Sequence, residues 1–271
     1  MFPLKDNIPT GRFPVVTVLL IAINVAVFLF FQHPTGFSGV NDAKVVKYGA
    51  IPYEITHPSK HCDLDPQVKG NVICEGKTAS VQTTEGVVSE PDPKHVPDKG
   101  STWLTLLSAM FMHGGFLHIA GNMLFLWIFG NNIEDALGRP RYIAYYLLGG
   151  LAALAGQVAV DPSSTVPTIG ASGAIAAVLG GYILLYPRAR VVTLIFIILF
   201  VTIIELPAMV VLGIWFLEQI YFGAAGLSNP VGGSGGVAYF AHIGGFAFGL
   251  IFIRAFVKRR KRLQPELAAY R

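Results

Sequence analysis

The sequence predicts an all-α polytopic membrane protein, a bundle of six transmembrane helices with both termini in the cytoplasm. Of the 271 residues, 53% are hydrophobic and only 13% are charged, whereas soluble domains carry about 25% charged residues. The hydrophobic residues form several long runs, and the basic residues gather in alternate connections between these runs. A soluble core needs no apolar runs of such length, so we expect an integral membrane protein.

Six apolar segments define the expected helices. Backbone polar groups in hydrocarbon must be bonded internally, so each segment should be helical. Strict alternation of apolar and polar residues is absent, which argues against a β-barrel. The segments span residues 14–31, 116–133, 141–160, 171–187, 191–222 and 237–257.

The fifth segment is too long for a single span, and it contains Glu205 and Pro207. Its two ends must lie on opposite sides of the membrane, so it crosses an odd number of times. We interpret 207–222 as the span. Residues 191–204 are then an interfacial or re-entrant stretch, or a bent extension of that helix.

Lysine and arginine indicate the topology. Loops 161–170 and 223–236 contain neither residue, whereas the other short connections and both ends of the chain are basic, at Lys5, Arg12, Arg139, Arg141, Arg188, Arg190 and within 254–271. Loop 32–103 holds seven lysines, but a loop of that length crosses largely regardless of charge. The positive-inside rule therefore places both termini in the cytoplasm and loop 32–103 outside. The basic residues that give the net charge of +4 lie mostly at the cytoplasmic ends of the expected spans. No nucleic-acid partner is therefore expected. The first span lacks an evident cleavage site and is expected to be retained.

Five parts of the chain follow from this topology. They are a cytoplasmic N-terminus (1–13), the first transmembrane helix (14–31), a long external loop (32–103), a core of five transmembrane helices (104–257) and a basic cytoplasmic tail (258–271). The external loop has ordinary soluble composition and holds both cysteines, Cys62 and Cys74. An external location permits a Cys62–Cys74 disulfide. Two free thiols, or a metal site shared with nearby histidines (His57, His61 and His95), are the alternatives.

Four polar residues inside the apolar segments are the candidates for function, because polar groups are costly in hydrocarbon. His118 and Asn122 lie one helical turn apart near the outer end of the second span. Ser172 begins the fourth span, and His242 lies near the outer end of the sixth. The topology thus places all four at one depth, although they come from three helices.

Stripes of small residues indicate how two of these helices could approach. Glycine or alanine recurs every fourth residue beside the serine and beside the histidine, at Gly173, Ala177, Gly181 and at Ala241, Gly245, Gly249. Such stripes allow close backbone contact in membranes. If the stripes face each other, Ser172 and His242 meet at the outer end of the contact.

A serine hydroxyl beside an imidazole is the minimal unit of nucleophilic catalysis. The Asn122 amide, a ring N–H of His118 and the backbone N–H of Ser172 are suitable donors for an oxyanion. No carboxylate that could orient His242 is evident, so we favour a dyad over a triad. Taken singly, each of these residues is more often structural, and only their combination points to catalysis.

Three motifs together resemble the rhomboid family of intramembrane serine proteases, over roughly residues 104–257. The elements are H-x-x-x-x-H-x-x-x-N at 113–122, G-x-S-G at 170–173 and A-H-x-x-G-x-x-x-G at 241–249. The resemblance implies that Ser172 is the nucleophile and His242 the general base. It further implies that His118 and Asn122 line the oxyanion hole and that His113 is structural.

The resemblance also implies a substrate class and a location. Single-span transmembrane proteins would be cut near the outer membrane face, in the lipid bilayer, at a small residue. We expect a bacterial cytoplasmic (inner) membrane protein that needs no cofactor and no metal. One departure from the family pattern is Ala176, where some members have a tyrosine beneath the histidine ring.

Substrate entry is expected beside the fifth span. We expect loop 223–236 to act as a lid and 207–222 to pack on the second span as a side gate, with Trp215 and Phe216 as candidates for that contact. Two other functions fit parts of the sequence. One is an inactive rhomboid-like binder, although such relatives typically lose the serine or the histidine. The other is a small-solute transporter with a path lined by Glu205, Glu218 and Gln219, although no inverted repeat is present.

Overall fold

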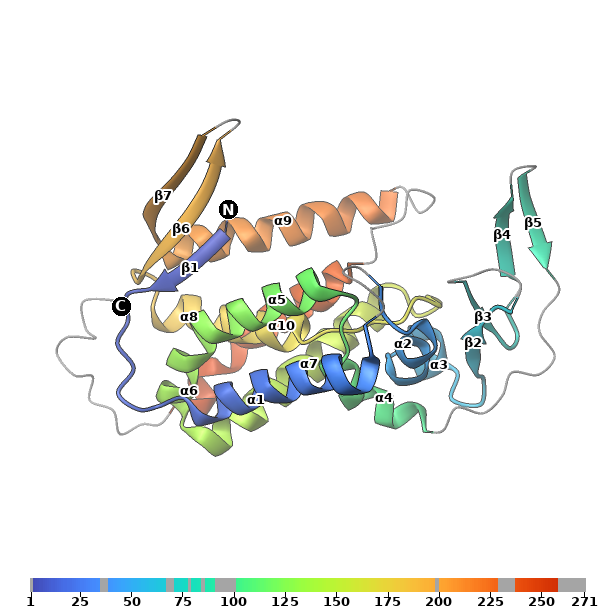
Figure 1. Ribbon diagram of the computed structural model, residues 1–271, viewed down its shortest axis with the longest axis horizontal. Helices are drawn as coiled ribbons and strands as arrows, with labels where there is room; N and C mark the ends of the chain where they lie inside the picture. The colour runs from blue at the N-terminus through green and yellow to red at the C-terminus, as the bar shows by residue number, and fades with distance from the viewer. Residues whose placement is uncertain are drawn as a thin grey trace.

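Helices that run alongside one another make up most of the molecule (Figure 1). The structure is a computed structural model that describes residues 2–34, 39–66, 71–77, 79–83, 86–90, 101–197, 200–228 and 237–257. The α-helices are α1 (Val15–Ala26), α2 (Asp42–Tyr48), α3 (Pro52–Thr56), α4 (Thr102–Ser108), α5 (Phe116–Phe125), α6 (Asn131–Leu137), α7 (Arg139–Val160), α8 (Ser172–Leu185), α9 (Ala208–Ser228) and α10 (Tyr239–Phe256). The π-helical η1 (Val27–Gln32) continues α1, and the 3-10 turn η2 (Ala109–Phe111) continues α4. The π-helical η3 (Leu126–Gly130) joins α5 to α6.

Three small antiparallel sheets lie at the two ends of the helical bundle (Figure 1). One end carries a sheet in the order β1-β6-β7, from Phe2–Asp6, Arg190–Ile197 and Phe200–Pro207. The other end carries two hairpins within loop 32–103, which pair β2 (Cys62–Leu64) with β3 (Val72–Cys74) and β4 (Ala79–Thr83) with β5 (Gly86–Glu90).

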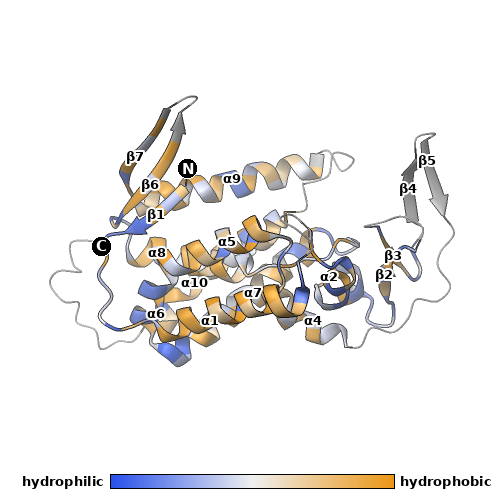
Figure 2. Cartoon of the chain, viewed as in Figure 1, coloured by the Kyte–Doolittle hydropathy of each residue, from blue (hydrophilic) through white to orange (hydrophobic). Residues whose placement is uncertain are grey.

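The expected polytopic helical bundle is confirmed. Among the described residues, five helical segments are long and apolar enough to cross a membrane: Val15–Gln32, Phe116–Leu137, Arg139–Val160, Ala208–Leu227 and Tyr239–Phe256. Hydrophobic residues dominate these helices (Figure 2). The remaining expected span, α8, has 14 residues and a length of about 21 Å. It is buried in the centre of the bundle, with residues 173–182 all buried. The count of six spans and the sidedness remain predictions.

The expectation that 191–204 is helical was wrong, because this stretch forms the hairpin of β6 and β7. Valine, isoleucine, threonine and phenylalanine fill it, and β-branched and aromatic residues favour strands. Val191 and Thr193 are buried against the bundle, whereas Val201 and Ile203 are 61% and 60% exposed. Apolar side chains on both faces hide the period of two that would otherwise identify strands.

The small-residue stripes of α8 and α10 face each other, which is the condition under which the sequence brings Ser172 and His242 together. A Cβ atom added to Gly245 would lie 2.1 Å from the carbonyl oxygen of Gly173, and one added to Gly249 would lie 2.2 Å from that of Ala177. Only glycine permits an approach this close, because any side chain would overlap the opposite backbone. The contact runs along α8 from the end at which Ser172 lies.

Buried carboxylates fasten the N-terminal segment to the bundle. The Glu134 carboxylate accepts bonds from the backbone N–H groups of Val16 and Thr17, at 3.0 and 2.8 Å, and so caps the first turn of α1. Asp6 in β1 accepts bonds from the Tyr182 hydroxyl and the Asn132 amide, both at 2.6 Å. These bonds join the start of the chain to α6 and α8.

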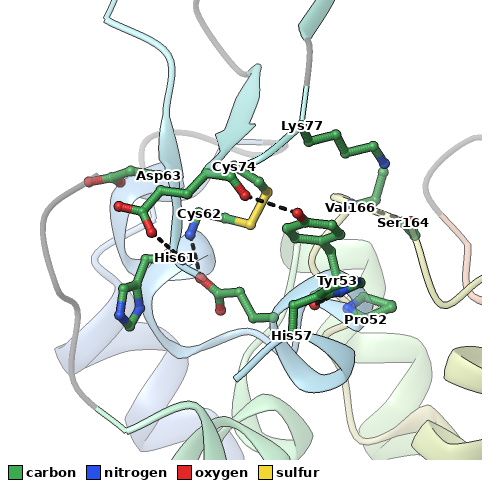
Figure 3. The surroundings of a disulfide bond; sticks show 12 residues. Pro52, Tyr53, His57, His61, Cys62, Asp63, Cys74, Lys77, Ser164 and Val166 are labelled. Atoms are coloured by element: carbon green, nitrogen blue, oxygen red, sulfur yellow. Dashed lines mark hydrogen bonds between the residues drawn. A yellow bond between two sulfur atoms is a disulfide. The ribbon is translucent and has the colours of Figure 1, made fainter. Parts of the chain in front are cut away.

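Loop 32–103 is fastened to the loop that leads to Ser172. The structure pairs Cys62 and Cys74 in a disulfide between β2 and β3, the first of the three alternatives (Figure 3). Ala50 and Thr168 exchange two backbone hydrogen bonds of 3.1 and 2.8 Å. The Tyr53 N–H donates to the carbonyl oxygen of Ser164 at 3.0 Å. Residues of loop 32–103 therefore hold segment 161–168 in place through backbone hydrogen bonds.

Candidate active site

Ser172 is the first residue of α8 and follows a tight turn. Gly170 has a φ of 116°, a conformation that residues with a Cβ atom rarely adopt. Its N–H donates to the carbonyl oxygen of Ala109 at 2.9 Å. A Cβ atom on Gly170 would lie 2.7 Å from Nε2 of His118 and 3.5 Å from Oγ of Ser172. Glycine is therefore required both for the turn and for the approach of these two side chains.

His242 bridges two polar side chains at the first turn of α10. Its Nε2 atom lies 2.8 Å from Oγ of Ser172, and its Nδ1 atom lies 2.8 Å from Oε1 of Gln219 on α9. The ring of Trp215 lies 5.7 Å away, centroid to centroid. Ser172 and His242, predicted from three motifs and a shared depth, thus meet within hydrogen-bonding distance.

Gln219 is the residue that sequence reasoning did not place in this site. From the sequence, Gln219 belongs only to the alternative transport path, because carboxylates are the usual groups that orient a catalytic histidine. An amide oxygen accepts the same hydrogen bond, and Gln219 is 7% exposed although the residues on either side of it are exposed. A polar residue on the buried face of an apolar helix was the available signal.

His118 and Asn122 lie on α5, and each has a donor suited to an oxyanion. The N–H of Gly114 donates to Nδ1 of His118 at 3.2 Å. In the neutral imidazole the hydrogen is then on Nε2, which lies on the side of Gly170 and Ser172. The Nδ2 atom of Asn122 is buried without a hydrogen-bond partner among the described residues. Buried donors without a partner are uncommon in folded proteins, so this amide is a candidate hydrogen-bond donor to a substrate group.

His113 lies before α5 and is completely buried. Its backbone N–H donates to Oε1 of Gln32 at 2.9 Å, and its carbonyl oxygen accepts from Nε2 of Gln32 at 2.8 Å. Burial lowers the pKa of the His113 imidazole to about 3, so the ring is neutral at physiological pH. The ring also lies edge-on to that of His118, with centroids 5.1 Å apart. These contacts agree with the expected structural role.

One cavity touches Ser172, and a second cavity lies near the same end of α10. A small one of about 30 Å³ touches Ser172 and is lined by small side chains, among them Gly150, Ala153, Gly173 and Ala174. A larger one of about 530 Å³ lies between the segment 161–169 and the nearby ends of α7, α9 and α10. Gln157, Asp161 and Ser164 contribute polar groups to its wall.

The expected gate contacts differ in part from the structure. Phe216 stacks on Phe246 with ring centroids 4.3 Å apart, and Trp215 lies against His242 and Phe246, so both rings face α10. The suggestion that they contact the second span was therefore wrong. Large aromatic side chains do not reveal their partner helix by composition alone.

The expected lid and the transport path also change with the structure. Of loop 223–236, the first part continues α9 to Ser228, and residues 229–236 lie outside the described chain. Glu205 pairs with Arg190 at 3.7 Å on the exposed β6–β7 hairpin. Glu218 is exposed on α9, whereas Gln219 faces His242. The three residues of the suggested transport path therefore do not share a lining.

Comparison with known proteins places the whole helical core in one family. The family model described as Rhomboid domain matches residues 100–259. Rhomboid protein 1, mitochondrial, of Saccharomyces cerevisiae is 29% identical over 169 residues, which cover 59% of this chain and 44% of the yeast protein. RHOMBOID-like protein 5 of Arabidopsis thaliana is 33% identical over 87 residues, or 32% of this chain and 28% of that protein.

A bacterial relative has protease in its name. Rhomboid protease GluP of Bacillus subtilis is 38% identical over 78 residues, which cover 29% of this chain and 15% of that protein. The chain thus spans less than half the length of each of these three relatives. The match to the family model covers more than half of the chain and includes Ser172, His242, His118 and Asn122. The chain therefore belongs to the rhomboid family.

Proposed function

We propose that this protein is an intramembrane serine endopeptidase that cleaves transmembrane proteins through a Ser172–His242 pair. The observation that carries the proposal is the 2.8 Å contact between Oγ of Ser172 and Nε2 of His242. Membership of a family that includes a named protease supports the same activity. A half-buried serine and histidine joined in this way are rarely needed for helix packing, which small residues already provide here.

The contact suggests a sequence of proton transfers. Nε2 of His242 accepts the hydroxyl proton as Oγ of Ser172 attacks the scissile carbonyl carbon. The oxyanion that forms accepts hydrogen bonds from Nδ2 of Asn122, Nε2–H of His118 and the backbone N–H of Ser172. The imidazolium then protonates the leaving amine as the C–N bond breaks. Water hydrolyses the acyl-enzyme with His242 again as base, which restores the serine.

The polar groups around Ser172 support the electrostatic part of this mechanism. The backbone N–H of Ser172 is at the N-terminus of α8, where the first four N–H groups have no partner within the helix. The Nδ2 atom of Asn122 is already buried and has no partner in the described part of the chain, so little reorganisation is needed when charge develops. Preorganised donors in a low-dielectric site stabilise an oxyanion more strongly than water does.

The cavities suggest what the substrate would look like. The 30 Å³ space at Ser172 has room for a group about the size of a methyl or a water molecule, which favours a small residue at the cut. A helical substrate hides its carbonyl groups in its own hydrogen bonds. We therefore infer single-span substrates with helix-weakening glycine or proline near the outer interface, and entry through a gate between α9 and α5.

The proposed location is the bacterial cytoplasmic membrane, with the active site near its outer face. Basic residues at the opposite end of the bundle, including Arg139, Arg141, Arg188 and Arg190, support this orientation. The Bacillus subtilis relative is bacterial, whereas the yeast relative is mitochondrial by name. Cysteine alkylation with a membrane-impermeant reagent after reduction, on intact cells, would test the orientation through Cys62 and Cys74.

Cleavage of a transmembrane substrate in proteoliposomes tests the proposal. We expect the wild type to cut a single-span test protein, and Ser172→Ala and His242→Ala each to abolish cleavage while the purified proteins remain monodisperse. The double variant should be no worse than either single one, because the two groups act as a unit. Substrate binding without cleavage by the wild type would instead favour an inactive rhomboid-like binder.

A further inference from the structure

Nδ1 of His242 is hydrogen-bonded to Gln219 on α9, whereas Ser172 lies on α8 and His242 on α10. We propose that Gln219 is a positioning residue for His242, so that the base is competent only while α9 is seated against α10. This inference rests on the proposed protease function. It extends the Ser172–His242 pair to a three-residue chain, and it makes the seating of α9 a condition for catalysis.

The hydrogen bonds of Gln219 determine how its amide is oriented. Nε2 of Gln219 donates to the carbonyl oxygen of Trp215 at 3.1 Å, one turn earlier in α9. The amide nitrogen is therefore occupied, and Oε1 is the atom that lies 2.8 Å from Nδ1 of His242. Because Oε1 can only accept, Nδ1 of His242 carries the hydrogen.

This assignment fixes the tautomer that the reaction requires. With the hydrogen on Nδ1, the Nε2 atom of the neutral ring has a free lone pair directed to Oγ of Ser172. The opposite tautomer would place a hydrogen on Nε2, and His242 could then not accept the serine proton. Loss of the correct tautomer is the main consequence when the third group of a serine-protease triad is altered.

In the part of the chain that the structure describes, no other side chain accepts a hydrogen bond from Nδ1 of His242. The groups around the ring are Ser172 from α8, Trp215 and Gln219 from α9, and His118 from α5, which interacts with it electrostatically. Position 176, where some rhomboid proteases have a tyrosine, is a buried alanine. Gln219 and the Trp215 ring thus provide the support that Ala176 cannot.

The position of Gln219 depends on how α9 packs. On the side of α9 that faces α10, Phe216 stacks on Phe246 with centroids 4.3 Å apart, and the half-exposed Phe222 stacks on Tyr239 with centroids 5.8 Å apart. The outer face of α9 is exposed, with Leu217 at 63% and Tyr221 at 70%. Hydrogen bonds weaken beyond about 3.2 Å, so a displacement of α9 by about 1 Å would release His242.

This coupling has a consequence for the proposed gate between α9 and α5. If substrates enter as α9 moves away from the bundle, the base is released during entry and restored when α9 returns. Opening and hydrolysis are then separate steps, and an enzyme with an open gate is held inactive. Phe216→Ala, which loosens α9 on α10, should therefore lower turnover, whereas a simple gate would predict faster cleavage.

Variants at position 219 test the proposal directly. Gln219→Met keeps most of the side-chain volume without a comparable acceptor, and Gln219→Ala removes both. Gln219→Glu keeps the acceptor. Glu218→Gln, an exposed change one residue away, is the matched control. The measurements are kcat and KM for the transmembrane test protein from pH 5 to 9, and the rate at which a fluorophosphonate modifies Ser172.

We expect Gln219→Ala and Gln219→Met to lower kcat by about 10- to 100-fold, the effect of losing one buried hydrogen bond at the reacting group. The fluorophosphonate rate should fall in parallel, and KM should change by less than about threefold. Gln219→Glu should restore most of the rate and move the acidic limb of the pH profile upward by about 1 pH unit or more, because a carboxylate favours the imidazolium. Glu218→Gln should behave as wild type.

Two results separate the possible failures. Wild-type rates and an unshifted pH profile in Gln219→Ala and Gln219→Met would overturn the role of Gln219 and leave the protease proposal intact. A wild type that neither cleaves the test protein nor reacts with the fluorophosphonate would overturn both. If Gln219→Ala does not fold, Gln219→Met and Gln219→Glu still decide the matter, since they differ in the acceptor.

Discussion

The Asp6 carboxylate is buried where β1 meets the bundle, and its titration should make stability depend on pH. Asp6 is 7% exposed and is bonded to Asn132 and Tyr182. Burial raises the pKa of this carboxyl from 3.8 to about 6, and the hydrogen bond from Tyr182 offsets only part of the effect. The folded protein therefore binds a proton at Asp6 more tightly than the unfolded chain does.

The sign and size of the effect follow from proton linkage. Protonation of Asp6 stabilises the fold. This stabilisation is fully present below about pH 4, the pKa in the unfolded chain, and it is lost as the pH rises through about 6. A shift of this size corresponds to about 3 kcal/mol, at 1.36 kcal/mol for each pKa unit. Asp6→Asn keeps an acceptor for both bonds without the charge, so the variant should gain stability over the wild type with rising pH.

Thermal unfolding in detergent from pH 4 to 7.5 measures this difference. We expect the Tm of Asp6→Asn to equal that of the wild type near pH 4 and to exceed it near pH 7. Asp42→Asn, the same change at an exposed carboxylate in α2, controls for the loss of an acid. A pH-independent difference, or a wild type that is the more stable protein at pH 7, would refute the reasoning.

Three further predictions concern the site and its surroundings. Asn122→Ala and His118→Ala should each lower kcat by about 10²–10³-fold, as expected for one oxyanion donor, and unchanged turnover in both would return them to structural roles. Replacing Cys62 and Cys74 with alanine should cost up to about 3 kcal/mol, the effect expected for closing a short loop, measured by limited proteolysis of loop 32–103; two alkylatable thiols in the unreduced protein would contradict the disulfide. Cross-linking α9 to α5 should block cleavage of a membrane-embedded substrate, and full-rate cleavage would exclude the gate.

Much of the helical architecture could be predicted because membranes impose strong constraints. Apolar length predicted the first residue of the helices that begin at Val15, Phe116, Arg139 and Tyr239 to within two residues. The stripes of small residues also indicated how α8 and α10 could approach each other. Glycine at a helix contact has a direct geometric meaning, because backbone atoms of the two helices touch there.

The β6–β7 hairpin could not be predicted in the same way. The rule that backbone groups must be bonded internally is satisfied by a paired hairpin as well as by a helix, and the uniformly apolar stretch 191–204 gave no period to distinguish them. Strand β1 was also invisible, because five residues such as Phe2–Asp6 become a strand only through pairing with β6. Tertiary pairing decided both structures.

The candidate site was predictable in its members but incomplete in its connections. Ser172 and His242 were found because motif, depth and stripe agreed. Gln219 was missed because it lies on a helix with no motif and because an amide was not considered as the group that orients the imidazole. Trp215 and Phe216 face α10 because of the rotation of α9 about its axis, which composition does not specify.

Peptide mapping of the fluorophosphonate adduct tests the central claim most directly. We predict a single modification on Ser172 of the natively folded protein, which is lost in His242→Ala although the serine is still present. Heat-unfolded wild type serves as the control and should not react, because an isolated serine hydroxyl is a weak nucleophile. Modification at a different residue, or an undiminished rate in His242→Ala, would contradict the account in which His242 activates Ser172.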